Sequence, residues 1–268
     1  MRRRSFAATL LSLVAGWRLR PAQSSLATLP TRPLGRTGLE ATILGLRGQH
    51  VSGSGPEANA HRLVEAALDE GINFFDTAES YGAGNSERWL GTALAGTRKS
   101  VILMTKTYAP AERSAESARR HLEGSLSRLQ TDYLDLWQLH GVQSPEDVDR
   151  AFGPGGAMEF ILEARRQGTV RFIGVTGHVT PAAHQRALEY WDRGIRFDVM
   201  QMPLNPLDWH QRSFTREVLP MLVDRGIGLI AMKTSADGAL PREGLSTIDE
   251  CQRYVWALPV SLAVVGME

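Results

Sequence analysis

Residues 73–92 read NFFDTAESYGAGNSERWLGT, and the order of residue types in this stretch predicts one strand followed by one helix. Phe74 and Phe75 are typical of a short buried strand, which stops at a single carboxylate, Asp76. The glycines that follow favour a turn. Ser86, followed at once by an acidic residue, is typical of a helix start. The stretch therefore predicts a βα unit with a carboxylate at the end of its strand.

The same alternation continues along the chain. Short apolar runs predict strands at Thr42–Leu46, Asn73–Asp76, Ile102–Lys106, Leu134–His140, Phe172–Thr176, Val199–Met202, Leu229–Lys233 and Leu262–Gly266. Amphipathic runs between them predict helices at Glu57–Glu70, Ser86–Ala95, Ala115–Leu129, Gly155–Gln167, Pro181–Arg193, Thr215–Arg225 and Ser246–Ala257.

The spacing of the predicted strand ends indicates the architecture. From Asp76 the successive ends lie 30, 34, 36, 25, 32 and 33 positions apart, at Lys106, His140, Thr176, Gln201, Lys233 and Gly266. One βα unit of a TIM barrel occupies about 31 residues, so the α/β fold class expected is a (β/α)8 barrel with these side chains on one rim. A doubly wound sheet is the alternative, but no G-x-G-x-x-G follows the first strand. We interpret Gly82-x-Gly84 as a turn before a helix.

Composition limits the partners of the chain. The 268 residues are 43% hydrophobic, and 30 basic residues face 29 acidic ones, so nothing in the charge balance points to nucleic acid. A single cysteine excludes an internal disulfide. No linker or composition shift divides residues 32–268, which we predict to form one barrel domain.

The first 27 residues differ in character from the rest. Three arginines precede an uncharged run at residues 5–17, which suits the apolar region of a signal peptide. Arg3, Arg4 and Phe6 fit the spacing of a twin-arginine export signal. For residues 1–27 we expect such a signal, with periplasmic delivery and no stable membrane insertion after its removal. A disordered basic tail on a cytoplasmic protein is the alternative, and the mass of the mature N-terminus distinguishes the two.

Four residues on the predicted rim carry a resemblance to a known family. Asp76, Tyr81, Lys106 and His140 resemble the catalytic tetrad of the aldo-keto reductases, in that order along the chain. The surrounding stretches are similar as well: GINFFDTAESYG, SERWLGTAL, LMTK, SLSRLQTDYLDLWQLH, RFIGVTGH, QMPLNP and GLIAMK. The resemblance extends over about residues 34–267 and implies a TIM barrel that reduces carbonyl compounds.

The chemistry of carbonyl reduction explains these residue types. Hydride must reach carbon while a proton reaches oxygen, so the site needs an acid that donates near neutral pH. A free tyrosine, with a pKa of about 10, is too weak unless positive charge favours its phenolate. Lys106 is expected to supply that charge, Asp76 to hold the ammonium, and His140 to orient the carbonyl oxygen or share the proton transfer. We predict an NAD(P)H-dependent reductase of an aldehyde or ketone, with Tyr81 as general acid.

A binding function on the same fold is the alternative. The chain would then bind nicotinamide nucleotide with little or no catalysis, as a sensor, a partner subunit or an inactive fragment. Taken alone, a lysine and an aspartate on a rim form a salt bridge, and a tyrosine after a strand packs in a loop. Four such polar groups gathered on one rim favour the enzyme.

The cofactor contacts follow from the resemblance. Thr176 and Gln201 match the strand ends that hold the nicotinamide amide, while Met232 and Lys233 match the stretch beside the ring and the diphosphate. A solvent-facing rim lysine is the alternative for Lys233. The pair after Thr176 is Gly-His, which departs from the family's commoner motif. The resemblance implies NADP(H) in preference to NAD(H).

Two further features bear on this expectation. Relatives continue past the VVGM stretch with a tail that carries groups for the 2′-phosphate and the last outer helix, so we expect a barrel incomplete at its C-terminal end. Arg47 stands where many relatives have glycine and is expected to narrow the entrance to the site. Metal spacing is absent from the five histidines that we interpret as surface or loop residues: His50, His61, His121, His184 and His210. No metal is therefore expected. A small carbonyl compound is the expected partner, and its identity and the oligomeric state are not predicted.

Overall fold

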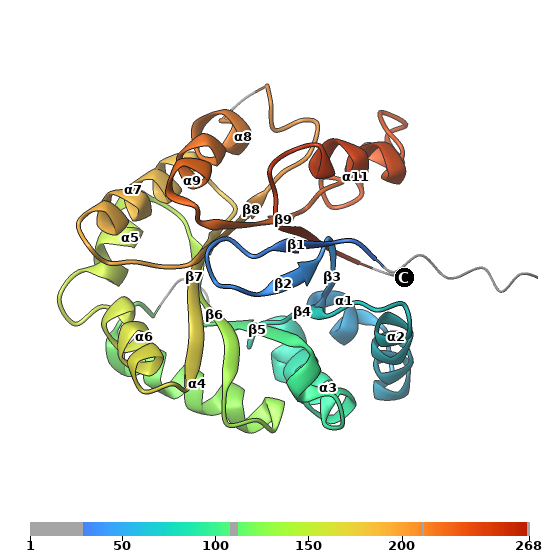
Figure 1. Cartoon of the computed structure of the whole chain (residues 1–268), viewed down its shortest axis with the longest axis horizontal. Coiled ribbons are helices and arrows are strands. Elements are labelled where there is room, and N and C mark those ends of the chain that lie inside the picture. The colour runs from blue at the N-terminus through green and yellow to red at the C-terminus, as the bar shows by residue number, and fades with distance from the viewer. Residues whose placement is uncertain (1–28, 108–111, 211, 267–268) are drawn as a thin grey trace, which may run out of the picture.

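The computed structural model describes residues 29–107, 112–210 and 212–266. Within them, eight parallel strands close into a barrel surrounded by helices (Figure 1). The ring runs in the order β10-β3-β4-β5-β6-β7-β8-β9. Its strands are β3 (Leu44–Arg47), β4 (Phe74–Asp76), β5 (Ile102–Lys106), β6 (Leu134–Val142), β7 (Val170–Gly177), β8 (Val199–Pro203), β9 (Gly228–Met232) and β10 (Leu262–Val265). The predicted (β/α)8 barrel is confirmed. The signal predicted for residues 1–27 lies outside the described residues, and the missing final helix stays a prediction.

Helices follow the strands around the outside of the ring (Figure 1). They are α1 (Gly48–Gly53), α2 (Glu57–Asp69), α3 (Asn85–Leu94), α4 (Ala115–Leu129), α5 (Pro145–Phe152), α6 (Ala157–Arg166), α7 (Pro181–Asp192), α8 (Phe214–Glu217), α9 (Leu219–Arg225), α10 (Ala239–Arg242) and α11 (Ile248–Trp256), with short 3₁₀ turns η1 (Tyr81–Gly84) and η2 (Arg98–Ser100). The single helix predicted at Thr215–Arg225 is wrong in one respect. It is divided at Val218, because Pro220 has no N–H to donate to the preceding turn.

A two-stranded hairpin closes the end of the barrel where the strands begin. It consists of β1 (Thr31–Pro33) and β2 (Glu40–Thr42), which lie across the middle of the ring in Figure 1. Its turn touches the start of β9, since a side chain at Gly35 would meet the backbone nitrogen of Gly228 at 2.3 Å. The strand predicted at Thr42–Leu46 is therefore two strands. The Thr42 hydroxyl donates to the Leu44 carbonyl at 2.8 Å, where the chain bends between them.

Side chains along each strand alternate between two cores, as the period of two requires. In β5, Ile102 and Met104 face the barrel interior, whereas Leu103 packs outward against the helices. The next inward position is Lys106, the last residue of the strand. The same parity places four other predicted rim residues inward: Asp76, His140, Thr176 and Gln201. In β9 the last inward residue is Met232, and Lys233, which was predicted on the rim, follows the end of the strand. The fold thus delivers polar groups to the open end of an otherwise apolar interior.

Candidate active site

Asp76 and Lys106 form a buried ion pair at the ends of neighbouring strands. Each is only 1% exposed, and the Lys106 Nζ donates to the Asp76 carboxylate and, at 2.8 Å, to the Thr77 carbonyl. Burial lowers the pKa of Lys106, but the neighbouring Asp76 and Tyr81 outweigh burial, and the net direction is upward. The ammonium therefore stays charged and fixed in place.

Tyr81 lies in the loop after β4 and reaches the same ammonium. Its hydroxyl is 3.5 Å from the Lys106 Nζ, which also lies 5.0 Å from the centre of the phenol ring. The backbone then runs through left-handed conformations at Gly82, Ala83 and Gly84, with φ of 57°, 53° and 84°. This turn directs the chain into α3. The first βα loop packs closely below it, because a Cβ on Gly48 would lie 2.3 Å from the Asp76 carbonyl.

His140 faces Tyr81 from β6. The two rings meet edge to face with centroids 6.2 Å apart. The ring nitrogen Nδ1 of His140 lies 3.2 Å from the Thr107 carbonyl oxygen, and the backbone N–H of His140 donates to the Thr107 hydroxyl at 3.1 Å. Since a carbonyl oxygen only accepts, this contact assigns the imidazole proton to Nδ1 and leaves Nε2 as an acceptor. Burial lowers the pKa of His140 to about 3, so the ring is neutral at physiological pH.

The acidity of Tyr81 differs from the expectation drawn from the sequence. Burial raises the pKa of Tyr81, while the charges of Lys106 and Arg47 lower it and Asp76 raises it further, and the net direction is upward. Positive charge near the phenol was expected to prevail. Burial prevails instead, so the phenol keeps its proton at neutral pH.

Comparison with known proteins gives this arrangement a family. The Aldo/keto reductase family model matches residues 44–254. The chain belongs to the aldo/keto reductase family. It is 33% identical over 232 residues to the uncharacterized oxidoreductase YrpG of Bacillus subtilis (strain 168), covering 80% of this chain and 69% of that protein. It is 34% identical over 271 residues to the 6-dehydroglucose reductase of Novosphingobium aromaticivorans, covering 88% and 86%. The holo form of an aldo-keto reductase from Bacillus halodurans superposes with a TM-score of 0.71 at 25% identity, covering 89% and 86%.

Aldo-keto reductases are oxidoreductases that use a nicotinamide nucleotide, and two residues here fit its carboxamide. Thr176, next to the last residue of β7, is the register partner of Gln201, the middle residue of β8. The Thr176 Oγ1 and the Gln201 Oε1 are buried and have no hydrogen-bond partner within the part of the chain that the structure describes. A buried polar atom without a partner costs about 1–3 kcal/mol. A carboxamide offers both an N–H donor for Gln201 and a carbonyl acceptor for Thr176.

The other two predicted cofactor residues, Met232 at the end of β9 and Lys233 after it, have different surroundings. Met232 is buried with the apolar side chains of the barrel interior. Lys233 has a left-handed φ of 53°, and its Nζ lies 2.7 Å from Asp237 Oδ2. Asp237 also accepts from Arg47 at 3.4 Å, and Arg47 in turn donates to Gln49 at 2.8 Å. Lys233 is therefore part of an ion-paired bridge that joins the loop after β9 to the last residue of β3.

Sequence reasoning missed Arg113, which supports the strand end that carries His140. Arg113 is 6% exposed and donates to the carbonyls of His140 and Gly141 at 2.8 and 3.1 Å. Its guanidinium also makes a two-point contact with Asp147, at 3.0 and 2.7 Å. Asp147 lies in the first turn of α5 and accepts from the Gln143 N–H at 3.1 Å. Only the helix signal of Ser144-Pro145 ahead of two acidic residues pointed to this region.

The histidines are also placed more exactly. His184 is fully buried on α7 against the ring of Phe214, which corrects its interpretation as a surface or loop residue. His121 lies on α4 and contacts Glu79 in the Tyr81 loop, so it too is more than a surface residue. Among the residues described, the structure contains no group of three or more His, Cys, Asp or Glu side chains placed to hold a metal ion.

The described helices include none with the length and hydrophobicity needed to cross a membrane.

Proposed function

We propose that this protein is an NAD(P)H-dependent carbonyl reductase in which Tyr81 donates the proton. The observation that carries the proposal is the position of the Lys106 ammonium, which is paired with Asp76 on one side and lies 3.5 Å from the Tyr81 hydroxyl on the other. A buried cation beside a phenol has a chemical use, because it stabilises the phenolate that forms when the proton leaves.

The charge of Lys106 acts in the direction that a proton donor needs. Lowering the pKa of a phenol from about 10 to about 7 takes roughly 4 kcal/mol. One positive charge at about 4 Å supplies about that much at an effective dielectric of 20. Burial and Asp76 oppose Lys106, and the pKa of Tyr81 is raised. Tyr81 therefore starts protonated, as a proton donor must, and Lys106 stabilises the phenolate that transfer leaves behind.

The remaining residues position the reactants. A bound nicotinamide supplies the hydride, and Thr176 and Gln201 would hold its carboxamide through their unpaired oxygens. Met232 would contact the ring, and Lys233 would lie near the diphosphate. The neutral His140 would use Nε2 to accept a hydrogen bond from the tyrosine hydroxyl or from a substrate hydroxyl, and it would not donate to the carbonyl. For the cofactor we propose NADP(H) in preference to NAD(H).

The direct test is oxidation of reduced nicotinamide by the purified chain with a panel of aldehydes and ketones. The panel should include keto sugars, because a relative is named as a 6-dehydroglucose reductase. We expect turnover that falls about 10²–10⁴-fold in Tyr81→Phe, which removes the hydroxyl and keeps the ring. Titration of both nucleotides against tryptophan fluorescence measures the cofactor preference. If the unmodified chain and Tyr81→Phe both bind nucleotide but neither turns over any carbonyl compound, the reductase hypothesis is wrong and a nucleotide-binding barrel is favoured.

A further inference from the structure

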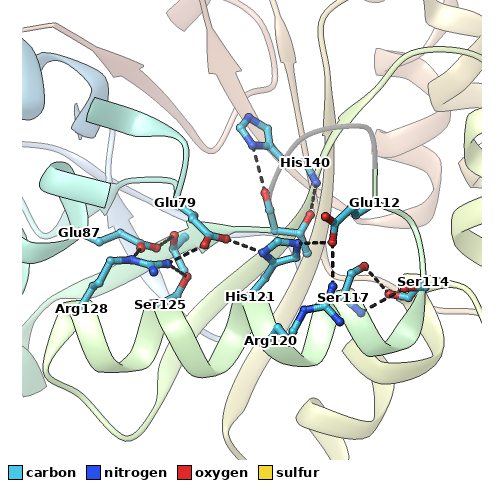
Figure 2. Close-up of polar contacts among 12 residues, drawn as sticks. Glu79, Glu87, Glu112, Ser114, Ser117, Arg120, His121, Ser125, Arg128 and His140 are labelled. Carbon is cyan, nitrogen blue, oxygen red and sulfur yellow. Dashed lines mark hydrogen bonds and ion pairs between the residues drawn. The ribbon is translucent and has the colours of Figure 1, made fainter. Parts of the chain in front are cut away.

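The loop that carries Tyr81 is fastened to helix α4 through Glu79. Glu79 lies two residues before Tyr81, and its carboxylate contacts two side chains of that helix (Figure 2). The His121 Nδ1 is 2.7 Å from Oε2, and the Arg128 NH2 is 3.2 Å from Oε1. All three side chains are mostly buried. Since α4 is a 15-residue helix packed on the barrel, it gives the loop a rigid support.

Arg128 connects this support to the strand that carries Lys106. Its Nε donates to Glu87 at 2.6 Å, so one guanidinium lies between the carboxylates of Glu79 and Glu87 (Figure 2). The Glu87 side chain is fully buried on α3 and accepts from the Thr105 hydroxyl at 2.6 Å. Thr105 directly precedes Lys106 on β5. The contacts therefore run without a break from the Tyr81 loop to the residue beside the ammonium.

The loop needs such a support because Tyr81 does not lie on a strand. Ala83 holds a left-handed φ of 53°, a conformation that is strained for a residue with a side chain. The hydroxyl of Tyr81 is at the outer limit of hydrogen-bond distance from Lys106, 3.5 Å. A displacement of about 1 Å at a reacting group can cost on the order of 100-fold in rate. A small movement of this loop would therefore separate the proton donor from its cation.

We propose that Glu79 is a positioning residue, which holds the Tyr81 hydroxyl against Lys106 by joining the loop to His121 and Arg128 on α4. This rests on the proposed role of Tyr81 as proton donor. Glu79 itself does not reach the reacting atoms. It acts by restricting the phenol, so its contribution should depend on the presence of the phenol hydroxyl.

The test compares Glu79→Gln with Glu116→Gln, an 85% exposed glutamate on α4 whose partner is Arg120. We expect Glu79→Gln to lower kcat about 10–100-fold with little change in KM, and Glu116→Gln to leave both unchanged. The decisive step repeats Glu79→Gln in the Tyr81→Phe background. Residues that act as a unit are not additive, so the loss in kcat should disappear there. An equal loss in both backgrounds would mean that Glu79 merely stabilises the fold, and would overturn the proposal.

A second readout does not require activity, so that failure of the proposed function can be distinguished. The ultraviolet titration of the chain minus that of Tyr81→Phe reports the ionisation of Tyr81. Burial raises the pKa of Tyr81, and loosening the loop should let it fall toward the ordinary value of about 10 in Glu79→Gln. An unchanged titration in Glu79→Gln would refute the positioning role. If the titration of Tyr81 shifts in Glu79→Gln but the chain shows no turnover, the positioning role of Glu79 is supported and the proposed reductase activity is wrong.

Discussion

Replacing Lys106 with Met should destabilise the fold far more than the loss of a surface ion pair would. The substitution keeps an unbranched side chain that is one atom shorter, and it leaves Asp76, 1% exposed, without its cation. Removing one partner of a buried pair costs about 3–5 kcal/mol, and the Thr77 carbonyl loses its donor as well. Since domains of this kind are stable by only about 5–15 kcal/mol, a loss of this size is about a fifth or more of the free energy of unfolding. Urea unfolding followed by circular dichroism measures this loss.

The matched control is Arg253→Met. Arg253 makes an ion pair with Asp249 on α11 while 75% exposed, and such pairs contribute about 0.2–1 kcal/mol. A double variant, Asp76→Asn with Lys106→Met, removes both charges and should regain part of the stability that Lys106→Met loses. A loss below about 1 kcal/mol for Lys106→Met, equal to that of the control, would refute the idea that this pair is sealed from water.

Three further outcomes follow from the same structure. Burial lowers the pKa of His140 to about 3 and of His184 to about 4, below the unfolded value of about 6.5. Below pH 6.5 the unfolded chain therefore binds more protons than the folded chain, and the free energy of unfolding should fall as the pH drops from about 6.5 to 4. A flat pH profile of stability from urea titrations would contradict this. Arg113→Met should destabilise the fold by about 3 kcal/mol and should lower kcat, because Arg113 supports the backbone of His140. Arg150 contacts the same Asp147 but is 63% exposed, so Arg150→Met should change neither the free energy of unfolding nor kcat. Thr176→Val should weaken nicotinamide binding up to about tenfold without loss of thermal stability, because the hydroxyl has no partner among the described residues; unchanged affinity by fluorescence titration would exclude the carboxamide contact.

The sequence predicted the barrel well because its signals are periodic. Ile102–Lys106 and Ala115–Leu129 were predicted with the bounds that the structure shows, since β-branched apolar runs and a 3.6-residue stripe are each decided locally. The sequence analysis missed the break between β2 and β3. The break depends on two hydrogen bonds of Thr42: its hydroxyl donates to the Leu44 carbonyl, and its backbone N–H donates to Asn73 Oδ1 at 2.9 Å. No local pattern encodes such a contact across 31 positions.

The candidate site was predictable in its members and not in its balance of forces. A polar residue at the last inward position of an apolar strand is visible in the sequence, as at Asp76 and Lys106. How deeply Tyr81 is buried is a property of the assembled loops, so its raised pKa was not predictable from the residue types. Arg113 was missed for a related reason, since it meets Asp147 34 positions away across two loops.

The distribution of charges around the mouth has a physical reason. Asp76, Lys106 and His140 all lie on strands, where neighbouring strands pair with Asp76 and Lys106, and the Thr107 hydroxyl and Arg113 hold the backbone of His140. Tyr81 alone among the four lies in a loop, where backbone support is weakest. One cluster of charges that joins elements lies beside that loop, with Arg128 between Glu79 and Glu87. If Tyr81 gives up a proton at one fixed point, as we propose, the barrel alone does not fix its position, and the proposed support comes from the ion pairs that join its loop to the helices behind it.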